Sequence, residues 1–286
     1  MRRIPVAVRA IIIGLVVTLA ATLPCDFLVQ SNLKIAAQIP WAAPAVLAYL
    51  ALYLKYLRGW GWPRSTALAR RDSMRAAGLP WPAWRWSLFS GGCALAASIA
   101  LLMVVRRLVA WPAAAEEFPA RLSGLFIVIT LVTSAVVAGV SEEAGFRGYM
   151  QRMMERRYGP AFAIFVTSIV FGLAHVTHGL RPLPLLFDGL WGALYGILAY
   201  LSGSIIPGII LHSSLDSVEF LAVWKGALGS RPLIWQSGID KQFLLVAAVA
   251  LIFTPVAVWA FRRLAALTRD EREHMDAFGP TSPFER

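Results

Sequence analysis

The residues best suited to chemistry in this 286-residue chain are Glu142, Glu143 and Arg147, which follow the apolar run 122–140. Ionisable side chains at membrane depth are costly, so they usually face a cavity or one another. Residues four apart share one face of a helix, so Glu143 and Arg147 are expected to pair as a structural clamp. Glu142 is rotated by about 100° around the helix axis and is free for other work. We therefore favour a chemical role for Glu142.

Two further pairs have the same i,i+4 spacing, Phe171 with His175 and His212 with Asp216. The Phe171 ring is expected to wall the pocket that holds His175, and Asp216 shares a helix face with His212. A structural interpretation of each pair stays open, because a membrane histidine often serves only to hydrogen-bond a neighbouring helix. Taken together, the pairs predict an active site built from carboxylates and imidazoles on several membrane helices.

The elements that must position these residues are membrane helices. The chain is 58% hydrophobic and only 15% charged, with a mean hydropathy of +0.64, far from the composition of a soluble domain. We predict an all-α, polytopic membrane protein with about eight transmembrane helices that enclose an intramembrane catalytic cavity. The expected spans are 10–29, 41–57, 88–105, 122–140, 161–173, 183–201, 205–224 and 243–261.

The net charge of +11 is interpreted as positive-inside bias rather than as a nucleic-acid footprint. Most lysines and arginines lie on one side if both termini are cytoplasmic, and the protein is placed in a bacterial inner membrane. The basic loops are expected to touch anionic lipid headgroups, and no nucleic-acid partner is expected. Cys25 and Cys93 form no CxxC pair, so a thiolate zinc site is excluded and no disulfide is expected.

The chain is expected to form one integrated membrane domain with three regions. Region 1–121 holds three spans and a basic cytoplasmic loop, 122–224 is the catalytic core, and 225–286 is the last span with a loose cytoplasmic tail. A signal peptide at the N-terminus is an alternative, but the first apolar run continues without a convincing cleavage site, so a retained first span is favoured.

The turn signal Arg157-Tyr158-Gly159-Pro160 predicts a helical hairpin. Glu142 lies 15 residues before Arg157 and His175 lies 15 residues after Pro160, so equal rise per residue puts both at the same level, about 22 Å from the turn. This arrangement requires the helix that carries Glu142 to continue, kinked or tilted, to Arg157. The alternative is a membrane exit near Glu142.

The ordered set EExxxR, FxxxH and HxxxD resembles the CAAX protease and bacteriocin-processing family of intramembrane endopeptidases, which includes the type II CAAX prenyl endopeptidases. The matching segments are 142–147, 171–175 and 212–216, within roughly 122–224. Eight spans also suit that family. The resemblance implies a glutamate protease that needs no metal or other cofactor.

By this resemblance, Glu142 activates a water with help from His175, and His212 and Asp216 stabilise the oxyanion that forms on the peptide carbonyl. Supporting roles fall to three residues: Glu143, Arg147 and Phe171. Prenyl endopeptidases generally carry asparagine at the Asp216 position. An ionised carboxylate donates no hydrogen bond, so Asp216 is either protonated or orients His212. The expected partners are the bilayer and a peptide or protein substrate, with a lipidated or membrane-anchored substrate left open.

Three alternatives stay open. The first is a zinc protease with ligands drawn from Glu142, His175, His178 and His212, although HExxH is absent. The second is a proton-coupled transporter, although no inverted repeat is found. The third is an inert scaffold or bacteriocin-immunity factor. Asp188 and Glu219 are interpreted as structural or cavity-lining acids.

Overall fold

A computed structural model describes residues 4–269 apart from 37, 77, 111–117, 120, 179–180 and 227–230. Across these residues the chain is all-helical without a β-strand, as predicted. Six helices are long and apolar enough to cross a bilayer, so the prediction of an integral membrane protein is confirmed. They are α1 (Val6–Ile35), α4 (Trp81–Leu108), a continuous helix Gly124–Tyr158, α8 (Pro182–Ser202), α9 (Ile206–Trp224) and α11 (Lys241–Leu267).

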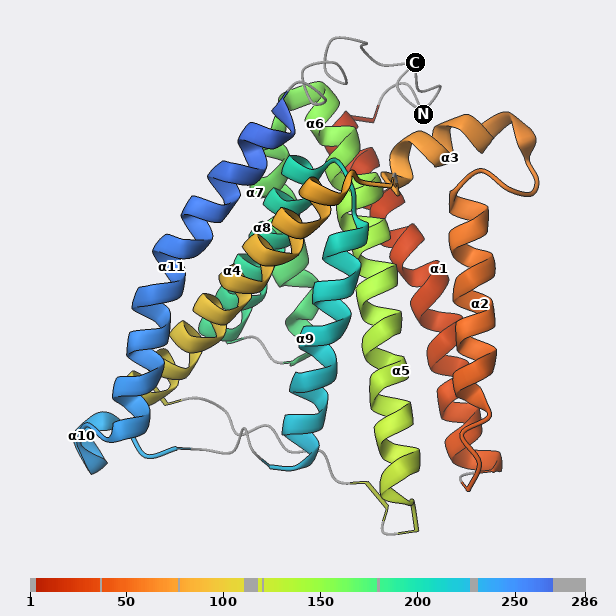
Figure 1. Cartoon of the computed structure of the whole chain (residues 1–286). Helices are drawn as coiled ribbons and strands as arrows, with labels where there is room; N and C mark the ends of the chain where they lie inside the picture. Colours follow the sequence, from red (N-terminus) through yellow and green to blue (C-terminus); the bar gives the residue numbers. More distant parts are fainter. Residues whose placement is uncertain are drawn as a thin grey trace.

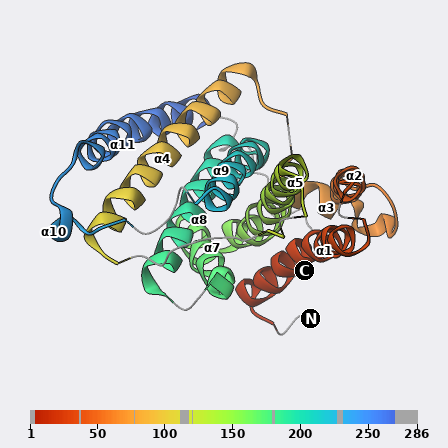
Figure 2. The ribbon, with the colours of Figure 1, turned by 90° about the horizontal axis from the view of Figure 1, so that it is seen from below.

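Two apolar helices are shorter than a full span, α2 (Ala42–Leu57) and α7 (Pro160–Ala174). Together with the six long helices they occupy the eight predicted positions. The start of α1, the end of α11 and the short helix α3 (Ala67–Met74) lie at one end of the bundle (Figure 1). The small helix α10 (Ile234–Ser237) lies at the other. Viewed along the bundle, α4 and α11 flank one side, α1, α2 and α5 the other, and α7 to α9 lie between them (Figure 2).

The long helix is built from three consecutive parts, α5 (Gly124–Glu142), the π-helix η2 (Glu143–Gln151) and α6 (Arg152–Tyr158). Ser123 caps its start by accepting a 3.2 Å hydrogen bond from the Phe126 amide. Gly159 ends it with φ +84° and Pro160 opens α7, so the predicted helical hairpin and the continuation beyond Glu142 are confirmed.

Helix α1 crosses η2 at backbone contact distance. A Cβ added to Gly145 would lie 2.6 Å from the Gly14 carbonyl oxygen and 2.0 Å from Oγ1 of Thr18. Small residues permit such crossings, which in membranes gain their stability from van der Waals packing. The first predicted span is therefore packed directly against the middle of the long helix.

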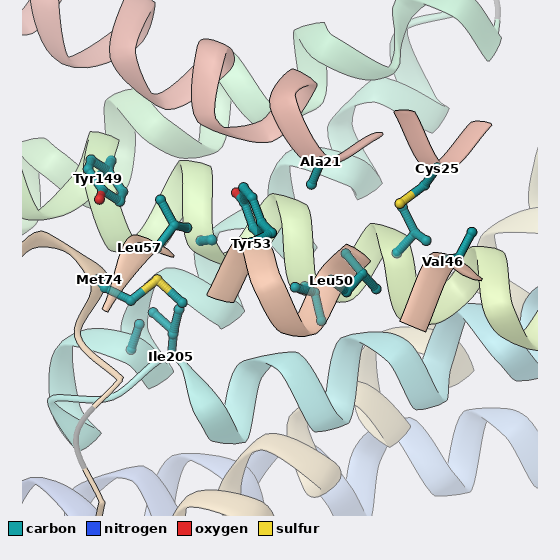
Figure 3. Close-up of a cluster of buried hydrophobic side chains, with 13 residues drawn as sticks. Ala21, Cys25, Val46, Leu50, Tyr53, Leu57, Met74, Tyr149 and Ile205 are labelled. Carbon is teal, nitrogen blue, oxygen red and sulfur yellow. The ribbon is translucent and has the colours of Figure 1, made fainter. Parts of the chain in front are cut away.

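A buried apolar cluster ties the N-terminal helices to the rest of the bundle (Figure 3). Val46, Leu50 and Tyr53 of α2 face Ala21 and Cys25 of α1. The Tyr53 hydroxyl donates to the Val17 carbonyl at 2.9 Å, so its polar end is satisfied within the apolar cluster. Further members come from the end of α3, from η2 and from the start of α9: Met74, Tyr149 and Ile205.

One boundary of the predicted spans changes. Helix α4 begins at Trp81 rather than near 88, because Pro82 suits a first helical turn. Helices α8 and α9 are joined by a turn at Gly203, while α8 packs mainly on α7 and α9 on α5. The predicted cytoplasmic tail beyond 269 lies outside the described residues.

Candidate active site

The predicted EExxxR motif lies where the long helix changes from α to π geometry. Glu142 is the last residue of α5, and Glu143 to Gln151 form the π-helix, in which every residue is buried. The π-helix is rare, and local π geometry within α-helices is frequent at functional sites. Gly145 lets α1 approach this segment closely, so the unusual backbone is held by protein on that side.

The predicted clamp between Glu143 and Arg147 is present, and it holds a third group. Oε1 of Glu143 lies 3.1 Å from Nη1 of Arg147 and 3.1 Å from Nδ1 of His212. Nη2 of Arg147 donates to the Gly192 carbonyl of α8 at 3.1 Å. Through these contacts the pair joins the long helix to α8 and α9. Glu143 and Arg147 are 0% and 1% exposed, so the pair lies in a water-poor interior.

The other ring nitrogen of His212 faces two more carboxylates. Nε2 lies 3.7 Å from Oε2 of Glu142 and 3.5 Å from Oδ2 of Asp216. Oε2 of Glu142 is buried and accepts no hydrogen bond. His212 is thereby placed between three acids, with Glu143 fixing its orientation through Nδ1. A buried carboxylate oxygen without a hydrogen-bond partner next to an imidazole is an arrangement suited to proton transfer.

Phe171 and His175 come to the same place from α7. Nδ1 of His175 donates to the Phe171 carbonyl at 2.8 Å, at the point where α7 gives way to the 3-10 turn η3 (His175–His178). The Phe171 ring lies 4.7 Å from the His175 ring and 6.1 Å from the His212 ring. Its face also receives the Arg147 guanidinium at 4.3 Å. The Phe171 ring therefore lies against His175, as predicted, and also near His212.

All seven predicted site residues therefore gather around one buried cluster: Glu142, Glu143, Arg147, Phe171, His175, His212 and Asp216. Their roles stay predictions. Glu219 follows Asp216 by three residues on α9, and Asp188 lies on α8, both half-buried. Glu219 is close enough to Asp188 and Asp216 for their charges to interact.

Two further residues of the candidate site were not predicted from the sequence. Tyr195 of α8 stacks on His212, with ring centroids 4.6 Å apart and planes inclined by 12°. Gly208 of α9 lies under Glu143, where an added Cβ would be 2.6 Å from Oε2. Neither belongs to the EExxxR, FxxxH and HxxxD set. The one available signal for Tyr195 was a hydroxyl within an apolar helix that also contains Gly192 and Gly196.

The zinc alternative requires a group of side chains that can hold a metal ion. Among the described residues, no group of three or more His, Cys, Asp or Glu side chains is arranged to hold a metal ion. The His178 side chain, one of the ligands considered, lies outside what the structure describes. The absence of a cofactor requirement stays a prediction.

Comparison with known families matches residues 124–218 to the family described as type II CAAX prenyl endopeptidase Rce1-like. The matched segment starts with α5 and ends within α9, so it contains all seven predicted site residues. The resemblance predicted from the motifs is confirmed. The match indicates a membrane protease that acts on a peptide or protein substrate. No curated protein and no solved structure matches the chain.

Proposed function

We propose that this protein is an intramembrane endopeptidase that hydrolyses a peptide bond with a water activated by a glutamate. The observation that carries the proposal is the placement of His212. Glu143 holds its Nδ1 at 3.1 Å, while Nε2 faces Glu142 and Asp216 at 3.7 and 3.5 Å. Each pair could be structural alone. A single imidazole between three acids matches a site that binds, moves and returns a proton.

In the proposed reaction, Glu142 is the general base. Its Oε2, which accepts no hydrogen bond from the protein, accepts one proton of a water while the water oxygen attacks the peptide carbonyl. His175 helps to position that water from the α7 side of the site. The carbonyl π electrons move to oxygen, which becomes the oxyanion. As the C–N bond breaks, Glu142 returns the proton to the leaving amine.

His212 stabilises the oxyanion by donation from Nε2. Asp216, an acceptor when ionised, then holds the ring of His212 rather than donating to the oxyanion itself. Glu143 and Arg147 orient His212 from the opposite side, and the Phe171 ring lies 6.1 Å from the His212 ring. This chemistry requires no metal.

The proposal includes eight spans around the site, with α2 and α7 as the two short ones. A locally thinned bilayer accommodates helices of 15 and 16 residues. We further propose that the end with α3 and α6 is cytoplasmic in a bacterial inner membrane. It carries Arg64, Arg70, Arg71 and Arg75 and, from α6, Arg152, Arg156 and Arg157, as the positive-inside rule requires.

The substrate is proposed to be a lipidated or membrane-anchored peptide or protein, and nucleic acid is not a partner. The test compares the new protein termini in membranes of cells that carry the wild type or Glu142→Gln. Termini that appear only with the wild type would support the proposal and identify the cleaved bond. Asp26→Asn is the matched control, since Asp26 is an exposed acid of α1 outside the site, and it should behave as wild type.

Other outcomes of the same experiment separate the alternatives. Identical termini in the two strains, with both proteins accumulated in the membrane, would contradict proteolysis and favour a scaffold or immunity role. Proton-driven flux into proteoliposomes that depends on Glu142 would favour a transporter. Cleavage that chelators abolish and zinc restores would overturn the metal-independent mechanism.

A further inference from the structure

The Tyr195 ring is stacked on His212, and its hydroxyl has no hydrogen-bond partner among the described residues. Tyr195 is 2% exposed, and its hydroxyl oxygen is buried. A buried polar group left unpaired is unfavourable, so each one calls for a physical explanation. Tyr53 of α2 shows the ordinary solution in this protein, since its hydroxyl donates to the Val17 carbonyl at 2.9 Å.

Charged groups lie near the Tyr195 hydroxyl. Glu142, Glu143 and Asp216 are close enough for their charges to affect it, and an ionised carboxylate only accepts hydrogen bonds. Nη2 of Arg147 donates to the Gly192 carbonyl, and Nη1 forms an ion pair with Glu143. Of the two residues assigned above to the oxyanion, only His212 donates a hydrogen bond when Asp216 is ionised.

We propose that the Tyr195 hydroxyl is a second hydrogen-bond donor to the oxyanion, beside Nε2 of His212. This role rests on the proposed peptide hydrolysis. Tyr195 stays neutral: it keeps its proton and donates a hydrogen bond, while Glu142 takes the proton of the water and gives it to the leaving amine. The role supplies the neutral donor that an acid at position 216 does not provide.

The stack fixes the plane of the Tyr195 ring. An inclination of 12° at a centroid distance of 4.6 Å keeps the phenol and imidazole planes nearly parallel. Arg147 lies 5.4 Å from the centre of the same phenol ring, which packs Tyr195 from a further direction. A donor preorganised in this way requires little rearrangement as negative charge develops.

The ring and the hydroxyl are separable by substitution. Tyr195→Phe keeps the stack and removes the donor, whereas Tyr195→Leu removes both. Tyr53→Phe is the matched control, because it removes a buried hydroxyl from α2, away from the site. The assay uses the purified full-length protein and a peptide that contains the bond identified by the comparison of termini.

We expect Tyr195→Phe to lower kcat about 100-fold with KM changed less than about 2-fold, as for loss of one oxyanion donor. Tyr53→Phe should leave both constants within about 2-fold of wild type. If Tyr195→Phe cleaves the peptide as fast as the wild type and only Tyr195→Leu is impaired, the donor role is overturned and a stacking role remains. Absence of wild-type cleavage would overturn the proposed function itself, and the donor role with it.

Discussion

Two buried carboxylates on the long helix differ in how completely their oxygens are bonded. Glu155 of α6 accepts from Nη1 of Arg75 at 3.1 Å and from Gln151 at 2.8 Å on one oxygen, and from Nη2 of Arg75 on the other. Glu143 of η2 bonds His212 and pairs with Arg147 through Oε1, but its buried Oε2 has no hydrogen bond. The neighbouring Glu142 also keeps such an oxygen.

The difference distinguishes a structural ion pair from a candidate active site. Arg75 adopts left-handed backbone geometry, with φ +48°, and its carbonyl accepts from the Ile205 amide at 3.1 Å. The Arg75–Glu155 pair therefore anchors the connection between α3 and α4 to α6 and to the start of α9. A carboxylate whose two oxygens are both bonded is suited to holding helices together. Glu143 keeps one oxygen open while it holds His212 in place, and the open oxygen of Glu142 beside His212 is suited to moving protons.

The comparison is tested most severely by Glu142→Gln. The amide cannot accept a proton at neutral pH, so cleavage should fall at least about 1,000-fold. The protein should still accumulate in the membrane with a melting temperature near that of the wild type. These quantities are measured by peptide cleavage and by thermal unfolding in detergent. Cleavage at more than a tenth of the wild-type rate would rule out Glu142 as the general base.

Glu155→Ala should show the opposite pattern. Removing one partner of a buried ion pair leaves Arg75 uncompensated, at a cost of about 3–5 kcal/mol of folding stability. Reduced yield and a lower melting temperature are expected, while the folded fraction keeps a cleavage rate within a few-fold of wild type. Unfolding and active-site titration on the same sample would separate the two effects. Full stability together with lost cleavage would place Glu155 in the chemistry instead.

Gly208→Ala sharpens the comparison at the site itself. The new methyl group would lie 2.6 Å from Oε2 of Glu143, so the carboxylate must shift and release or rotate His212. Overpacking typically costs about 1–3 kcal/mol, and we expect cleavage to fall about 10-fold or more. Gly92→Ala on α4 is the control, because nothing lies within 4 Å of its added Cβ. Equal behaviour of the two variants would contradict the close fit under Glu143.

The smallest effect is expected at Asp240, which precedes α11. The Phe243 amide donates to the Asp240 carboxylate and is the main cause that lowers the pKa of Asp240 below its ordinary range. Arg107 donates to the same carboxylate and lowers this pKa further. The stabilisation is present above the unfolded pKa of about 3.9 and disappears as pH falls through the lower folded value. Asp240→Asn should therefore cause a small drop in melting temperature at pH 7 that vanishes at low pH. A difference that persisted under acid conditions would assign the effect to something other than charge.

Much of this architecture was predictable because apolar runs and turn residues act locally. Gly159 and Pro160 fixed the hairpin that brings His175 back toward Glu142. The i,i+4 pairs placed Glu143 against Arg147 and His212 near Asp216. The predicted start of α4 near residue 88 followed the apolar run alone, whereas Pro82 in the first turn allows the helix to begin at Trp81.

The rest depended on contacts between distant segments. A π-helix has no periodic signature in nine residues of mixed polarity, so η2 was not predicted. The bond from Glu143 to His212 joins residues 69 positions apart and follows from how α5 packs on α9. Tyr195 and Gly208 contribute to the site through the way they pack against side chains of other helices. The spacing of residues along one helix does not predict such packing.

The Gly14–Gly145 crossing also has a consequence for how the protein is made. Helix α1 meets the partner that approaches its backbone at Gly14 only after about 130 more residues have been synthesised. Until then α1 can pack on α2, through the cluster around Val46 and Leu50. His212 and Asp216 emerge later still. The nascent chain therefore lacks the complete set of proposed catalytic residues until α9 is inserted.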